Sequence, residues 1–121
     1  MIDHVFMHVK DYDRSKRFYS VALKPLGYEL LREDRKTAGL GMGGKPDFWF
    51  GEVQKPQTKV HFAFTAQTRK QVDSFYTEAL AAGGKDNGAP GLRKHYHQNY
   101  YGAFVLDPDG YNVEVVCHKP E

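Results

Sequence analysis

The sequence has a single cysteine, no long apolar run and no cluster of charge of one sign. Cys117 has no partner for an internal disulfide, and it stands in a strand-like apolar run, so we assign it no redox role. No stretch approaches the roughly 18 consecutive apolar residues of a membrane span, and the N-terminus lacks the layout of a signal peptide. The 17 basic and 15 acidic residues are scattered, without the basic stripe of nucleic-acid-binding proteins. We therefore expect a cytoplasmic protein that binds neither nucleic acid nor a membrane.

Aromatic side chains, by contrast, are plentiful: the chain has eight Tyr, eight Phe and one Trp among 121 residues. A chain of this length fits one domain, residues 1–121, built around one core. The aromatic content exceeds what a minimal core demands and suits an apolar cleft for a small organic ligand.

An internal repeat organises the chain. At an offset of 57 residues the two halves share six identities. The matched pairs are His4 and His61, Phe18 and Phe75, Tyr19 and Tyr76, Ala22 and Ala79, Leu23 and Leu80, and Gly27 and Gly84. Each half begins with strand-like alternation, continues with helical periodicity and ends in short β-rich segments separated by Gly and Pro. The repeat predicts two β-α-β-β-β modules, residues 1–54 and 58–118, joined around residues 54–58.

Capping residues and turn residues predict the element boundaries. Asp11 or Asp13 caps the first helix, which ends near Gly27, and Thr68 caps the second helix, which stops at residues 83–84. Strands are expected at 2–9, 28–31, 38–42, 47–53, 60–65, weakly near 85, and at 100–106 and 111–118. The polar segment 83–99 is expected to form a loop that acts as a lid or an entrance. Together these elements predict an α+β domain whose modules form a curved, cup-shaped mixed sheet with helices on its outer face.

Strand parity places two histidines on the inner surface of this sheet. His61, Ala63 and Thr65 share one face, and the apolar residues between them are expected to pack on the helix. By the repeat, His4 lies on the corresponding inner face of the first module. Considered alone, His4 fits a solvated residue near a terminus, and His61 fits a hydrogen-bonded core histidine.

The hairpin turn 106–111 aligns a glutamate with these histidines. If Leu106 opposes Tyr111, then Ala103 opposes Glu114; a bulge at Gly110 would shift this register by one residue. In either register parity leaves Glu114 on the inner surface. We therefore expect His4, His61 and Glu114 to converge on one cavity.

Two imidazoles and a carboxylate form a plausible metal site. Glu114 stands between two valines, and a buried carboxylate needs a cation, a hydrogen-bond network or water. Such a set leaves coordination positions open for water and substrate, as at non-haem iron, and also suits zinc, manganese or nickel. Protons compete for the imidazoles, so occupancy should fall on acidification.

Other polar and aromatic residues have more than one interpretation. His8 shares the face of His4 and is either an acid–base group or a solvated histidine. His95 and His97 would chelate a metal at i, i+2 if extended, but their position in a loop favours a surface or gating role. Trp49 and Tyr101 are candidates for lining the substrate pocket, or else fill the core or a dimer interface.

The chain resembles the vicinal-oxygen-chelate superfamily of glyoxalases, bleomycin-resistance proteins and extradiol dioxygenases, over nearly its whole length. Four segments carry the resemblance: I-D-H-V at 2–5, D-R-S-K-R-F-Y at 13–19, V-H-F-A-F at 60–64 and F-V-L-D-P-D-G-Y-N-V-E at 104–114. The resemblance implies paired β-α-β-β-β modules around a divalent metal, commonly in a homodimer. It places the metal ligands on His4, His61 and Glu114.

The resemblance does not select one reaction. Glyoxalase I has a further glutamate in the last strand of its first module, where this chain has Phe and Trp between Asp47 and Glu52. The two-His-one-Glu pattern is closer to the extradiol dioxygenases, which usually have two such domains and additional acid–base histidines. Three functions remain: a metal-dependent lyase, isomerase or dioxygenase acting on a small substrate; a metal-free protein that sequesters a small molecule, as in antibiotic resistance; and an accessory domain without chemistry.

Overall fold

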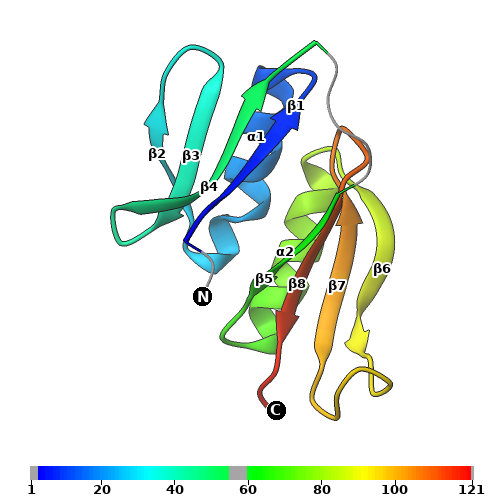
Figure 1. Cartoon of the computed structure of the whole chain (residues 1–121). Coiled ribbons are helices and arrows are strands. Elements are labelled where there is room, and N and C mark those ends of the chain that lie inside the picture. The colour runs from blue at the N-terminus through cyan, green and yellow to red at the C-terminus, as the bar shows by residue number, and fades with distance from the viewer. Residues whose placement is uncertain (1–2, 55–59, 121) are drawn as a thin grey trace.

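The computed structural model describes residues 3–54 and 60–120 and contains two β-α-β-β-β modules side by side (Figure 1). The first consists of β1 (Val5–Val9), α1 (Tyr12–Ala22), the short 3-10 helix η1 (Lys24–Leu26), β2 (Glu29–Glu33), β3 (Thr37–Met42) and β4 (Lys45–Glu52). The second consists of β5 (His61–Thr65), α2 (Arg69–Ala81), β6 (Lys85–Leu92), β7 (Tyr101–Leu106) and β8 (Asn112–Cys117). The predicted α+β class and modular order are confirmed. Residue 2 of the first predicted strand and residues 55–58 of the predicted connection lie outside the described residues.

The two modules repeat one topology. Each forms a four-stranded mixed sheet, in the order β1-β4-β3-β2 and β5-β8-β7-β6. The first strand of each module pairs in parallel with the last, and the remaining pairs are antiparallel. The helices begin at the predicted caps: the Asp11 side chain accepts from the Arg14 amide, and Thr68 forms a capping box with Gln71.

The apolar faces of the two sheets meet, and their opposite faces are open to solvent. Phe48 of β4 contacts Phe62 and Phe64 of β5, with ring centroids 5.4 and 5.3 Å apart. On the other face of β1, Phe6 is 51% exposed. We call the face that carries Phe6 and Trp49 the first open face, and the face that carries His61, Phe104 and Glu114 the second open face. Because the modules join through their buried faces, the open faces lie on the outside of this joint.

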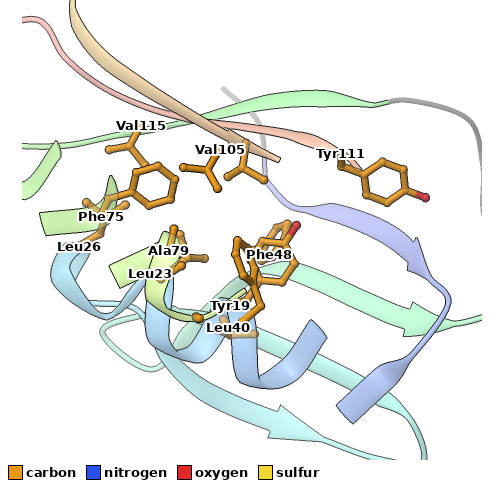
Figure 2. Close-up of a cluster of buried hydrophobic side chains, with 14 of the residues drawn as sticks. Tyr19, Leu23, Leu26, Leu40, Phe48, Phe75, Ala79, Val105, Tyr111 and Val115 are labelled. Atoms are coloured by element: carbon orange, nitrogen blue, oxygen red, sulfur yellow. The ribbon is translucent and has the colours of Figure 1, made fainter. Parts of the chain in front are cut away.

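The core spans both modules. Figure 2 shows Tyr19, Leu23 and Phe48 of the first module in one cluster with Phe75 and Val105 of the second. In the strands that carry the candidate ligands, Val113 and Val115 are fully buried on the helix side, as parity predicts. This alternation directs Glu114 to the second open face.

The segment predicted as a loop is largely a strand. Residues 85–92 form β6, which pairs with β7 and shifts register around Gly88, so the loop is confined to residues 93–100. The prediction of a loop over 83–99 is therefore wrong for its first half. Glycine and proline weakened the strand signal in the sequence, and the pairing of β6 with β7 is interrupted by register shifts around these residues.

The β7–β8 hairpin has the shifted register. A five-residue turn, 107–111, pairs Leu106 with Asn112, so Phe104 rather than Ala103 opposes Glu114. The Asp107 carboxylate accepts from the backbone amides of Asp109 and Tyr111, at 2.8 and 2.9 Å. Gly110 supplies the positive φ of +87° that the turn requires. These bonds, rather than a simple four-residue turn, fix the register.

The same turn docks on the first module. Tyr19 of α1 donates from its hydroxyl to Asp107 at 2.5 Å, and both side chains are buried. Asp109 accepts from the Lys10 amide at 3.2 Å, and the Tyr111 hydroxyl donates to the His8 carbonyl at 2.8 Å. Burial raises the pKa of the Asp107 carboxyl, because desolvation disfavours its charge, while its hydrogen bonds act in the opposite direction.

No helix in the described ranges is long and apolar enough to cross a membrane.

Removing the Tyr19 hydroxyl should weaken the joint between the modules. Tyr19→Phe leaves the ring in the core but deprives a buried carboxylate of one donor, which typically costs about 1–3 kcal/mol of unfolding free energy. Urea unfolding at fixed protein concentration measures this loss.

Tyr76→Phe is the matched control, because the Tyr76 hydroxyl also donates to an aspartate, Asp86, but on the surface. We expect no measurable change there. Equal stability of the two variants would show that the buried bond does not hold the modules together.

Candidate functional site

His61 and Glu114 lie together on the second open face. His61 Nε2 is 3.2 Å from Glu114 Oε1, and the side chains are 50% and 3% exposed, respectively. Neighbouring parallel strands position them, since Ala63 of β5 pairs with Glu114 of β8. The imidazole is therefore reachable from solvent, whereas the carboxylate is almost completely covered.

The hydrogen bonds of His61 indicate the orientation of its ring. His61 Nδ1 is 3.1 Å from the Asn112 carbonyl oxygen, which can only accept, so Nδ1 carries the proton. In a neutral imidazole Nε2 then presents a lone pair to a carboxylate oxygen. Two acceptors at this distance need a positive charge between them or nearby, which either a proton on Nε2 or a bound cation supplies.

Tyr100 covers the other carboxylate oxygen. Its hydroxyl donates to Glu114 Oε2. Burial raises the pKa of the Tyr100 phenol, and the bond to Glu114 adds to the rise, so Tyr100 remains a donor at neutral pH. The sequence reasoning did not single out Tyr100. Tyr100 and Phe104 lie on one face of the strand, but the register expected from the sequence directed that face toward the helices.

Phe104 extends the site along the sheet. Its ring stacks on His61 with centroids 6.3 Å apart and planes inclined at 28°. Phe104 was not predicted to be a site residue because the expected register placed Ala103 beside Glu114. The shifted register instead gives the second open face an apolar floor next to the polar pair.

His4 is separate from this pair. Its side chain is 59% exposed and its Nδ1 lies 2.8 Å from an Asp3 carboxylate oxygen. His4, Phe6 and Trp49 border a hollow of about 420 Å³, and His4 and His61 both border a cleft of about 560 Å³ between the modules. Within residues 3–54 and 60–120, no group of three or more His, Cys, Asp or Glu side chains is arranged to hold a metal. One chain thus brings together His61 and Glu114 but not the predicted triad.

Trp49 occupies the position in the first module that Glu114 occupies in the second. Trp49 pairs with Phe6, just as Glu114 pairs with Ala63, the repeat partner of Phe6. Its ring covers Gly39, where an added Cβ would lie 2.7 Å from the indole. Trp49 therefore lines the first open face, where a carboxylate ligand would otherwise stand.

The two acidic residues of that strand have structural partners. Asp47 accepts from the Tyr28 hydroxyl at 2.9 Å, and Glu52 accepts from the Tyr12 amide at 2.8 Å. Neither bond places a carboxylate next to His61. The acidic residues of β4 therefore supply no second carboxylate beside that pair.

His8 and Tyr101 lie apart from the His61–Glu114 pair. His8 makes an edge contact with Phe6 at 5.7 Å on the first open face, so it accompanies His4. Tyr101 faces the helix side, where its hydroxyl donates to Asp73 of α2 at 2.7 Å and Arg69 lies over its ring. The expectation that Tyr101 lines the ligand pocket is not met, because its parity is opposite to that of Glu114.

His95 and His97 belong to an aromatic surface cluster in the 93–100 loop. His97 Nδ1 accepts from the Asn99 amide at 3.1 Å, and its ring lies 5.4 Å from that of His118. The His95 ring lies 4.2 Å from that of Tyr96. These contacts favour the surface interpretation over chelation.

Comparisons with known proteins agree with this architecture. The family model "Glyoxalase/Bleomycin resistance protein/Dioxygenase superfamily" matches residues 1–115. The uncharacterized protein YqjT of Bacillus subtilis (strain 168) is 31% identical over 132 residues, covering 94% of this chain and 96% of the relative.

Two solved structures are also similar. A glyoxalase/bleomycin resistance protein from Albidiferax ferrireducens T118 has a TM-score of 0.79 and 28% identity, covering 98% of both chains. A glyoxalase I mutant from Zea mays has a TM-score of 0.72 and 27% identity, covering 99% of this chain and 45% of that one. The fold of two mixed sheets agrees with the family match over residues 1–115 and with these relatives. The chain therefore belongs to the glyoxalase/bleomycin resistance protein/dioxygenase superfamily.

Proposed function

We propose that this protein is a metal-dependent enzyme that acts on a small organic substrate chelated through its oxygens. His4, His61 and Glu114 would hold a divalent ion of iron, manganese, nickel or zinc, and the reaction would be of the lyase, isomerase or dioxygenase type. The observation that carries the proposal is the contact between His61 Nε2 and a nearly buried Glu114 carboxylate.

This pair fits a metal in two respects. Histidine ligands commonly donate their second ring N–H to a backbone carbonyl, as His61 does to Asn112, which presents Nε2 as the ligand atom. Carboxylate ligands are in turn held by hydrogen bonds, as Tyr100 holds Glu114. A divalent ion would also satisfy the charge of a carboxylate that is only 3% exposed.

The third ligand is best supplied by a second copy of the chain. Within one chain His4 belongs to the first open face, and His61 and Glu114 belong to the second. A homodimer that apposes the first open face of one chain to the second open face of the other would bring all three together twice. It would also cover Phe6, an apolar side chain that is 51% exposed on the first open face.

The residues around the site would have different roles in the reaction. A divalent metal held by these residues would supply Lewis acidity to the substrate oxygens. Tyr100 fixes the Glu114 carboxylate and keeps its own proton. Phe104 would exclude water from one side of the site, and Trp49 of the apposed chain would exclude it from the other. His8 is the candidate for moving a proton.

A metal-free binding protein is the second candidate. The hollow of about 420 Å³ bordered by Phe6 and Trp49 favours it, since aromatic walls suit an aromatic or cationic ligand. In that case His61 and Glu114 would form an ion pair that needs no metal.

Elemental analysis of untagged protein purified without chelator separates the two functions. We expect about one ion per chain in wild type, and loss of the ion in His61→Ala and Glu114→Gln, since each removes a ligand of a pair 3.2 Å apart. Lowering the pH should release the ion, because protons compete for the imidazoles.

His97→Ala is the matched control and should retain full metal content, because His97 contacts Asn99 and His118 rather than Glu114. A wild type that stays empty after addition of Fe, Mn, Ni and Zn would favour the binding protein.

Mixing two variants that each lack a metal ligand tests whether the metal site is shared between two chains. His4→Ala and His61→Ala should each bind little metal alone. In a mixed dimer, however, one site combines both defects and the other has neither. After unfolding and refolding together, the mixture should recover roughly one ion per four chains.

A mixture of His61→Ala and Glu114→Ala gives the matched control. Both changes lie on the second open face, so each site of a mixed dimer lacks one ligand and we expect no bound ion. If the first mixture also stays empty while wild type binds metal, the site is assembled within one chain.

A further inference from the structure

The second open face carries a cation as well as the His61–Glu114 pair. The Arg93 guanidinium lies over the Phe104 ring, with Cζ 5.3 Å from its centroid. The His61 ring stacks on the same Phe104 ring, with the two centroids 6.3 Å apart. Arg93, Phe104 and His61 therefore form a row along one face of the sheet.

Backbone carbonyls hold Arg93 in a fixed orientation. Its Nη1 donates to the carbonyl oxygens of Gly91 and Gly102, at 2.8 and 3.2 Å. Its Nη2 donates to the Ala89 carbonyl at 2.8 Å. The guanidinium is thus pre-organised by β6 and β7 and does not have to be ordered when a ligand arrives.

Two donors of this guanidinium remain available. A guanidinium has five N–H groups, and the three carbonyl bonds use both on Nη1 and one on Nη2. The Nε–H and the second Nη2–H have no partner among the described residues. Carbonyls neutralise none of its charge, and no salt bridge to Arg93 occurs within the described residues. An oxyanion would satisfy both the charge and the two donors.

We propose that Arg93 binds an oxyanion of the substrate, a carboxylate or a phosphonate, while the substrate's chelating oxygens lie beside His61 and Glu114. Phe104 lies between the two ends and separates the charged end of the substrate from its chelating end. The preferred substrate is therefore anionic, with its charged group about one ring's width from the chelating oxygens. This inference rests on the proposed function and names the substrate class of the same site.

A ligand series tests this proposal with the wild-type protein. We would load the protein with Zn(II) and titrate it anaerobically, by calorimetry, with 3,4-dihydroxybenzoate, 3,4-dihydroxyphenylphosphonate and the neutral 3,4-dihydroxybenzamide. The vicinal hydroxyls are common to all three, so differences in Kd report the charged end alone. We expect at least one of the acids to bind about tenfold or more tightly than the amide, and the two acids show which oxyanion fits.

Arg93→Gln should abolish this preference while leaving the metal content and the Kd of the amide unchanged. Unchanged amide binding also shows that the variant is folded, although Arg93 contacts three carbonyls. Arg17→Gln, an exposed arginine on α1, is the matched control and should keep the wild-type preference.

The test remains decisive if the protein binds no metal. The proposed function then fails, and the same acids and amide are titrated into metal-free protein, where a preference that depends on Arg93 would still support the anion site. Equal binding of acids and amide by wild type would overturn the inference, as would a preference that persists in Arg93→Gln.

Discussion

The buried carboxylate of Asp107 fixes both the register of the β7–β8 hairpin and the position of that hairpin on the first module. Its bonds to the Asp109 and Tyr111 amides form a five-residue turn, and its bond from Tyr19 ties that turn to α1. The register in turn places Phe104 opposite Glu114 and directs both to one face. The turn that precedes β8 thereby determines which side chains surround the candidate ligand Glu114.

The joint between the modules determines what one chain can build. Because Phe48, Phe62 and Phe64 pack the buried faces of the two sheets together, the faces with polar candidates remain open. The candidates are divided between these faces, with His4 and Trp49 on the first and His61 and Glu114 on the second. The proposed homodimer would therefore join the nearly buried carboxylate of one chain to the exposed aromatic face of another.

The repeat and strand parity predicted most of the fold, because both reflect local alternation that packing preserves. Parity correctly placed Glu114 on the face of His61, since one flanking valine on each side had to be buried. It left the bulged turn as an alternative, because that turn depends on side-chain bonds of Asp107, and it predicted only a weak strand near residue 85 for β6, whose glycines and proline suppress the strand signal. It also joined His4 to His61 and Glu114; in one chain His4 and His61 border the same cleft, but the three side chains form no compact group. Tyr101, Tyr100 and Arg93 needed the register and the loop geometry.

The central claim is that a metal ion lies between His61 and Glu114 and draws its third protein ligand from a second chain. Anomalous diffraction from crystals grown with Zn(II) or Mn(II) tests it most directly. The account predicts one ion per chain bonded to His61 Nε2 and a Glu114 oxygen, with His4 of a neighbouring chain completing the set. A direct 3.2 Å contact between His61 and Glu114 with no ion bound to either in metal-saturated crystals would contradict it.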